Sequence, residues 1–94
     1  MNVDKAKKRI EKYIKKGFKG YPLILIEYFG KTQDCATEVV ITLTLQENEE
    51  PQIQKFSSKN NAREDETIQS VLVKTIELTN ANTVTEIEGV SLRN

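Results

Sequence analysis

The spacing of hydrophobic residues predicts two amphipathic helices. In residues 3–18, apolar side chains recur every three or four positions, which is typical of one face of an α-helix: Val3, Ala6, Ile10, Tyr13, Ile14 and Phe18. Residues 62–79 have the same period, with an expected inner stripe of Ile68, Val71, Leu72, Thr75, Ile76 and Thr79. Asn61 and Glu64 have the spacing of a capping box at the start of this second helix.

Four other segments have patterns typical of β-strands. Residues 23–29 are rich in β-formers, which predicts a strand that is largely buried on both faces. Residues 36–46 alternate apolar and polar positions, as a strand with one solvent-facing side does. Residues 52–58 have only two large apolar residues, three positions apart, which indicates a weak strand at the edge of the sheet. Residues 83–88 are expected to add a fourth strand, although their alternation is poor.

This order of elements, α-β-β-β-α followed by a further β, predicts an α+β fold. Three consecutive strands joined by short turns favour an antiparallel sheet of three to four strands. Both amphipathic helices are expected to pack on the one apolar face of that sheet. With 94 residues and 10.7 kDa, the whole of residues 1–94 is expected to form one small domain.

Composition removes several kinds of active site. The sequence has no histidine, so imidazole-bound zinc and nucleophile–histidine pairs are impossible. Cys35 is the single cysteine, so no intramolecular disulfide can form. Residues 1–20 are charged throughout and no apolar run is long enough for a membrane span, so we expect a cytoplasmic protein without a membrane partner. We expect no catalytic residue, no metal and no cofactor.

Charged residues are distributed unevenly along the chain. Residues 1–20 hold eight basic and two acidic residues, a net charge of +6, and the remaining residues have a net charge of −6. At 100° per residue, seven cations are expected on the side of the first helix opposite its apolar stripe: Lys5, Lys8, Arg9, Lys12, Lys15, Lys16 and Lys19. Such a surface suggests a non-catalytic module that binds an anionic partner, either nucleic acid or an acidic protein surface. The alternative is a solvated lysine-rich face, partly paired with the acidic remainder of the chain.

The order α-β-β-β-α also resembles that of the double-stranded-RNA-binding domain. That family begins its second helix with the pattern Ser-Lys-Lys-x-Ala-Lys, and Ser58, Lys59, Ala62 and Arg63 lie at the matching offsets. The resemblance implies a sheet covered by two helices and a contact with RNA. The sequence departs from the family at residues 64–66, where three carboxylates would repel a phosphate backbone. We therefore use the resemblance only as a comparison of folds.

A second functional hypothesis is a protein–protein interaction module or a homodimer. The predicted edge strand at residues 52–58 offers unpaired backbone groups to another chain. The opposite net charges of the two parts of the chain would complement each other across such an interface.

Overall fold

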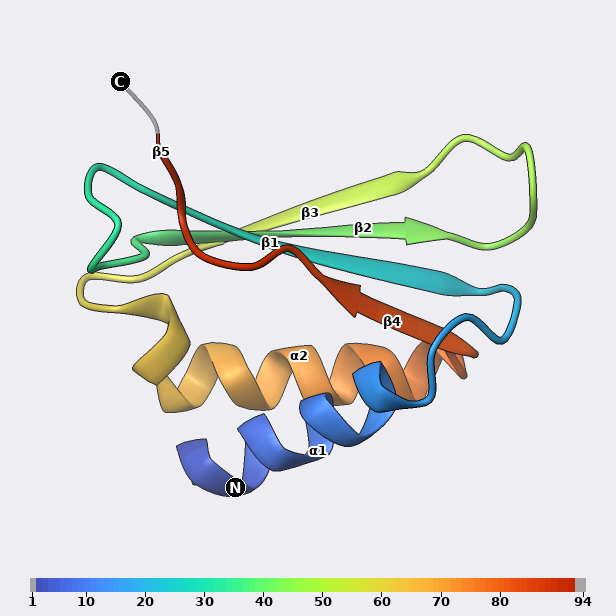
Figure 1. Ribbon diagram of the computed structural model, residues 1–94, viewed down its shortest axis with the longest axis horizontal. Helices are drawn as coiled ribbons and strands as arrows, with labels where there is room; N and C mark the ends of the chain where they lie inside the picture. The colour runs from blue at the N-terminus through green and yellow to red at the C-terminus, as the bar shows by residue number, and fades with distance from the viewer. Residues whose placement is uncertain (1, 93–94) are drawn as a thin grey trace.

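The structure is a computed structural model that describes residues 2–92, and its ribbon is drawn in Figure 1. Its helices and strands are α1 (Val3–Lys15), β1 (Leu23–Gly30), β2 (Glu38–Thr44), β3 (Gln52–Ser57), the 3-10 turn η1 (Ala62–Glu64), α2 (Glu66–Thr79), β4 (Thr83–Glu86) and β5 (Ser91–Leu92). The α+β class expected from the sequence is confirmed. The described part of the chain has no helix long and apolar enough to cross a membrane.

The sheet is mixed, so the expectation of a purely antiparallel sheet is wrong. Its strand order is β3-β2-β1-β4, and β5 pairs with the far end of β1. The first three strands form the predicted antiparallel meander, whereas β4 and β5 run parallel to β1. The direction of β4 follows from the segment that precedes it. The strand β3 runs the same way as β1, and α2 then carries the chain back along the sheet. The next strand must therefore start from the same end as β1.

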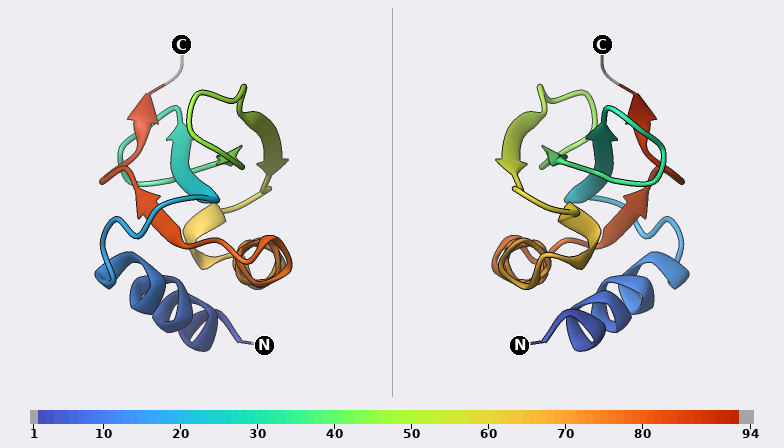
Figure 2. Two further views of the ribbon diagram at one scale, coloured as in Figure 1. Left: turned by 90° about the vertical axis from the view of Figure 1, so that its right-hand side faces the viewer. Right: turned by 90° about the vertical axis from the view of Figure 1, so that its left-hand side faces the viewer.

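Both helices lie on one face of the sheet, as Figure 2 shows in two side views. In β1, burial alternates strictly along the strand. Ile24, Ile26 and Tyr28 point toward the helices and are buried, while the residues between them are only half-buried. The strand is therefore largely buried on both faces, as predicted, and its more deeply buried face is the one toward the helices. Between sheet and helices lies a single core, made of Ala6, Ile10, Ile24, Ile26, Tyr28, Ala36, Val39, Ile41, Ala62, Ile68, Leu72, Val73, Ile76 and Val84.

The first helix is shorter than its hydrophobic pattern predicts. It begins after Asn2, whose side-chain oxygen accepts a hydrogen bond of 2.9 Å from the backbone N–H of Lys5. It ends at Lys15, because Gly17 takes a left-handed backbone with φ +71° that breaks the helix. Phe18, predicted on the apolar stripe, therefore lies beyond the helix and is 66% exposed.

The second helix begins four residues later than predicted. Asn61 caps the 3-10 turn η1, and Asp65 caps α2 by accepting from the N–H of Ile68 at 3.1 Å. These hydrogen bonds to the carboxylate hold the pKa of Asp65 below its usual value. The inner stripe is also rotated from the prediction, since Gln69 and Val73 are buried whereas Val71 is half-buried.

The strand β3 lies at the edge of the sheet, as predicted. It pairs only with β2, and its two large apolar residues fall on opposite faces. Phe56 packs against the core, while Ile53 points outward and is 60% exposed.

Candidate functional site

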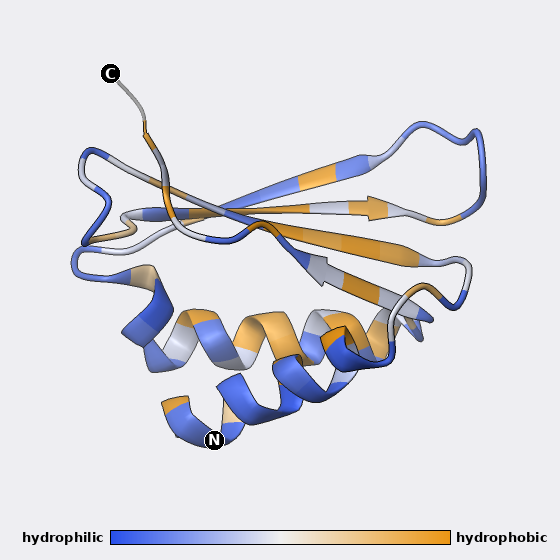
Figure 3. Cartoon of the chain, in the orientation of Figure 1, coloured by the Kyte–Doolittle hydropathy of each residue, from blue (hydrophilic) through white to orange (hydrophobic). Residues whose placement is uncertain are grey.

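The basic surface is built by α1 and by the loop that follows it. All seven predicted site residues are exposed: Lys5, Lys8, Arg9, Lys12, Lys15, Lys16 and Lys19. Six of them lie on α1 or at its C-cap, but Lys19 lies in the loop beyond, so its expected place on the helix is wrong. Figure 3 shows α1 coloured hydrophilic along most of its length, whereas α2 carries broad hydrophobic bands.

Part of this basic surface has a local structural cause. The opposite side of α1 buries Ala6 and Ile10, so polar residues are expected on the outside. Lys12 and Lys15 lie in the last turn of the helix, where a cation complements the negative end of the helix dipole. These effects explain why individual positions on the outer side of α1 are basic, but they do not explain why seven positions are.

Few of these cations are neutralised within the molecule. In the part of the chain that the structure describes, α1 forms two ion pairs with other elements. Lys7, which is not among the seven, pairs with Glu64 of η1. Nη1 of Arg9 lies 3.7 Å from Oε2 of Glu77 on α2. Within residues 2–92, six of the seven cations therefore have no carboxylate at ion-pair distance.

Three of the seven cations line one depression between α1 and α2. Its volume is about 320 Å³, and its lining consists of Arg9, Lys12, Tyr13, Lys16 and Glu77. A neighbouring hollow of about 410 Å³ shares Tyr13 and Glu77 and extends past the end of α2 to Asn82. Lys5, Lys8, Lys15 and Lys19 lie outside both linings. The depression therefore combines three cations and an aromatic ring with one carboxylate.

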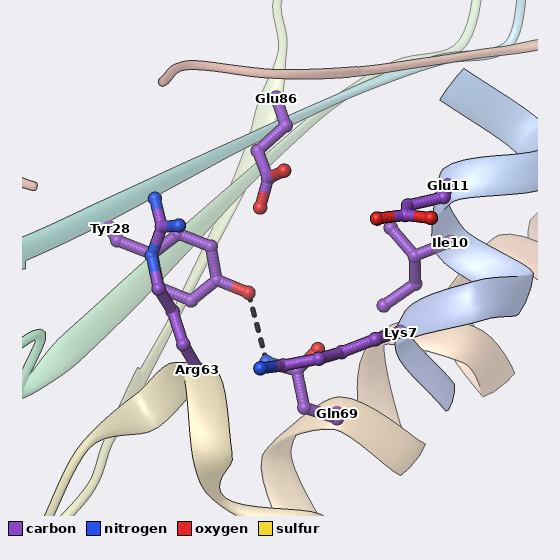
Figure 4. Close-up of a pocket in the computed structure, with 7 residues that line it drawn as sticks. All are labelled: Lys7, Ile10, Glu11, Tyr28, Arg63, Gln69 and Glu86. Carbon is purple, nitrogen blue, oxygen red and sulfur yellow. Dashed lines mark hydrogen bonds between the residues drawn. The ribbon is translucent and has the colours of Figure 1, made fainter. Parts of the chain in front are cut away.

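A separate polar pocket of about 170 Å³ lies between α1, the sheet and the start of α2 (Figure 4). Its polar lining was not singled out from the sequence as a site: Lys7, Glu11, Tyr28, Arg63, Gln69 and Glu86. At its centre, the side-chain amide of Gln69 donates to the Tyr28 hydroxyl at 2.9 Å and to the Ala62 carbonyl oxygen at 3.0 Å. The one sequence signal for this pair was a glutamine next to Ile68, at the border of the apolar stripe.

The cations of this pocket already have partners. The Arg63 guanidinium lies 4.6 Å from the centre of the Tyr28 ring and donates to the Gly89 carbonyl oxygen at 2.7 Å. Lys7 pairs with Glu64. Burial raises the pKa of Glu86 and also that of the Tyr28 hydroxyl. We interpret the pocket as a polar junction that joins five elements of the fold.

Most residues of the motif shared with the double-stranded-RNA-binding domain make contacts within the fold. Ala62 is buried, and Arg63 folds inward over Tyr28. The Ser58 hydroxyl donates to Asp65 at 2.9 Å. Only Lys59 of the four matching residues is exposed. This end of α2 therefore presents carboxylates outward in place of the cations that the resemblance implies.

The described residues contain no group of side chains that could hold a metal ion. Within residues 2–92, no three histidine, cysteine, aspartate or glutamate side chains gather as metal ligands would. Cys35 is half-buried, and its Sγ lies 3.8 Å from the Asn60 carbonyl oxygen, to which it donates.

No protein-family model, curated protein or solved structure matches the chain.

Proposed function

We propose that this protein is a non-catalytic module that binds nucleic acid through the basic surface of α1. The observation that carries the proposal is the depression in which Arg9, Lys12 and Lys16 converge. Lysine and arginine side chains bind phosphates by charge-assisted hydrogen bonds and release the counterions of the phosphate backbone. One carboxylate, Glu77, lies within this group of cations.

The distribution of acidic residues limits the contact to the C-terminal half of α1. Glu64, Asp65 and Glu66 lie at the start of α2, beside the first turns of α1, where Lys7 is already paired. Glu47, Glu49 and Glu50 lie in the β2–β3 turn. A phosphate backbone would therefore approach Arg9, Lys12 and Lys16 and avoid the N-terminal end of the helix layer. The proposal keeps the cytoplasmic location expected from the sequence, where Cys35 would stay reduced.

The direct test is the salt dependence of binding to a labelled oligonucleotide. Fluorescence anisotropy would be measured between about 50 and 200 mM salt for the natural protein and for an Arg9→Gln/Lys12→Gln/Lys16→Gln variant, which removes the three cations of the depression. The natural protein should lose affinity steeply with salt. The variant should bind at least about tenfold more weakly, and the slope of its salt dependence should be lower by about 0.7 for a single strand, or about 0.9 for a duplex, for each phosphate contact removed.

A matched variant controls for the loss of net charge. Lys31, Lys55 and Lys59 are exposed and lie away from α1, so replacing all three by glutamine makes the same change in charge elsewhere. This control should keep the affinity within about a factor of two to three, because screening limits distant charges. Equal losses in the two variants would mean that binding follows overall charge, and the proposed surface would be wrong.

Self-association through β3 is the second candidate function. It is favoured by the unpaired outer edge of that strand and by Ile53, which is 60% exposed. Sedimentation equilibrium would show a mass that rises with protein concentration, and Ile53→Lys would return the mass to that of a monomer. A constant monomeric mass at high concentration would remove this candidate.

A further inference from the structure

Phe18 is an exposed aromatic ring with no role in the core. It lies in the loop between α1 and β1, and 66% of its surface is exposed. Its ring contacts that of Tyr21: the ring centres are 5.9 Å apart and the rings meet edge to face at 84°. Single exposed hydrophobic side chains are common on protein surfaces, so the inference depends on what surrounds this ring and not on its exposure alone.

The loop that presents Phe18 is anchored to the start of β4. The Thr83 hydroxyl accepts from the N–H of Lys19 at 2.8 Å and donates to the Gly20 carbonyl oxygen at 2.7 Å. The side-chain amide of Asn82 donates to the Tyr21 carbonyl oxygen at 2.7 Å. Thr83 is 3% exposed, so water competes little for the two hydrogen bonds of its hydroxyl. The ring is therefore held on a fixed loop, and binding would require little ordering.

Two exposed cations lie within two residues of Phe18 in the chain, and one of them also lines the depression described above. Lys16 and Lys19 flank Phe18 in the chain, and both are exposed. Lys16 also lines the depression with Tyr13. The neighbouring hollow ends at Asn82, which is bonded to Tyr21. The proposed phosphate contacts and the open ring are therefore linked through Asn82 and Tyr21.

We propose that Phe18 is a stacking platform for an unpaired base, and that the ligand class is single-stranded nucleic acid. This inference rests on the proposed function, because the cations of α1 supply the phosphate contacts. Duplexes keep their base faces stacked inside the helix, whereas single strands expose faces on which aromatic side chains stack. An anionic membrane is less suited to this surface, since Ala6 and Ile10 on the apolar side of α1 are buried and only Phe18 remains to insert.

The test compares single-stranded and duplex oligonucleotides of the same sequence, about 12 nucleotides long. We expect the single strand to bind more tightly than the duplex. Phe18→Leu keeps an apolar side chain without the ring, and it should weaken single-strand binding about fivefold or more while leaving duplex binding unchanged. Leu78→Ala is the matched control, because Leu78 is 82% exposed on α2 and should not affect either ligand.

A fluorescent variant gives a direct readout of stacking. The sequence contains no tryptophan, so Phe18→Trp places a single indole at the site. A single strand should quench its emission, and the matched duplex should not.

Each contrary result has a distinct meaning. If Phe18→Leu binds as tightly as the natural protein while loss of the α1 cations weakens binding, the stacking role is wrong and the proposed function stands. If neither oligonucleotide binds, both proposals fail. Binding to phosphatidylserine vesicles that depends on Phe18, without oligonucleotide binding, would assign the surface to membranes and overturn the inference.

Discussion

The ammonium nitrogen of Lys16 lies 5.2 Å from the centre of the Tyr13 ring in the depression between the two helices. The electron-rich face of an aromatic ring attracts a cation at this distance. Tyr13 itself packs against the hydrophobic core. It therefore links the interior to the basic surface and keeps one cation of that surface near the C-terminus of α1.

The carboxylate of Glu77 should weaken anion binding, so its removal should strengthen it. It is the acidic residue that lines the depression, and it lies 3.7 Å from Arg9. We expect Glu77→Gln to tighten oligonucleotide binding by about two- to tenfold at low salt, because one repulsive charge is lost and Arg9 is released. Stability should change by less than about 1 kcal/mol, since the pair is exposed.

Glu49→Gln is the control for this gain. It makes the same charge change in the exposed β2–β3 turn, away from α1. Its effect on affinity, measured by the same anisotropy titration, should be smaller. Weaker binding of Glu77→Gln than of the natural protein would contradict the proposed phosphate contact.

Gln69 should be important for stability because it satisfies two buried acceptors. Its amide group donates to the Tyr28 hydroxyl and to the Ala62 carbonyl oxygen, and the residue is 2% exposed. Gln69→Leu keeps a similar volume but leaves both acceptors without this donor. We expect the free energy of unfolding to fall by about 1–3 kcal/mol in urea denaturation. Gln33→Leu, at an exposed turn position, should stay within about 0.5 kcal/mol of the natural protein, and an equally small effect of Gln69→Leu would contradict the role given to Gln69.

The stability of the folded protein should depend on pH through the carboxyl group of Glu86. Burial raises the pKa of its carboxyl above the ordinary value of 4.5, so folding favours the protonated form. Its contribution to stability is therefore fully present below the unfolded pKa and is lost as pH rises through the folded pKa. Glu86→Gln should unfold at higher urea concentration than the natural protein at pH 7.

The advantage of Glu86→Gln should shrink at a pH below 4.5, where both proteins are neutral at this position. Glu88→Gln, which removes an exposed carboxylate two residues along, serves as the control. A loss of stability in Glu86→Gln at pH 7 would mean that attraction to Arg63 and Lys7 outweighs burial.

Gly30 should tolerate no larger side chain. A Cβ atom built there would lie far inside van der Waals contact with the Cys35 carbonyl oxygen, and would also press on Val90 at 3.2 Å. Since a backbone oxygen must move, we expect Gly30→Ala to cost more than about 2 kcal/mol in thermal or urea unfolding. Gly89→Ala meets no atom within 4 Å and is strained only by its φ of +76°, so it should cost about 1 kcal/mol. If Gly89→Ala lost more stability than Gly30→Ala, the backbone of the β1–β2 turn would have to move at little energetic cost.

The local patterns of the sequence predicted the elements better than their connections. The alternation in residues 36–46 and the weak segment at 52–58 correspond to an inner strand and an edge strand. The direction of β4 was missed, because a strand's own residues do not record which way it runs. It follows from α2, which returns the chain to the start of β1.

The errors in the helices have similar causes. The apolar period continues to Phe18, but the left-handed backbone of Gly17 ends the helix and turns that ring outward. Gln69 was missed because hydropathy excludes glutamine from a core, although the buried Tyr28 hydroxyl needs a donor. The exposure of the six cations on α1 and at its C-cap followed from helical periodicity. Which of them line a depression depends on where α2 packs, and no local pattern encodes that position.

The most direct test of the phosphate-binding surface is an NMR titration of backbone amide shifts with a short single-stranded oligonucleotide, at low salt and then at higher salt. We expect saturable shifts concentrated at Arg9, Lys12, Tyr13 and Lys16 and in the Phe18 loop, and these shifts should weaken as salt is added. No shifts at low salt, or shifts centred on β3 and the β2–β3 turn, would contradict the proposed surface.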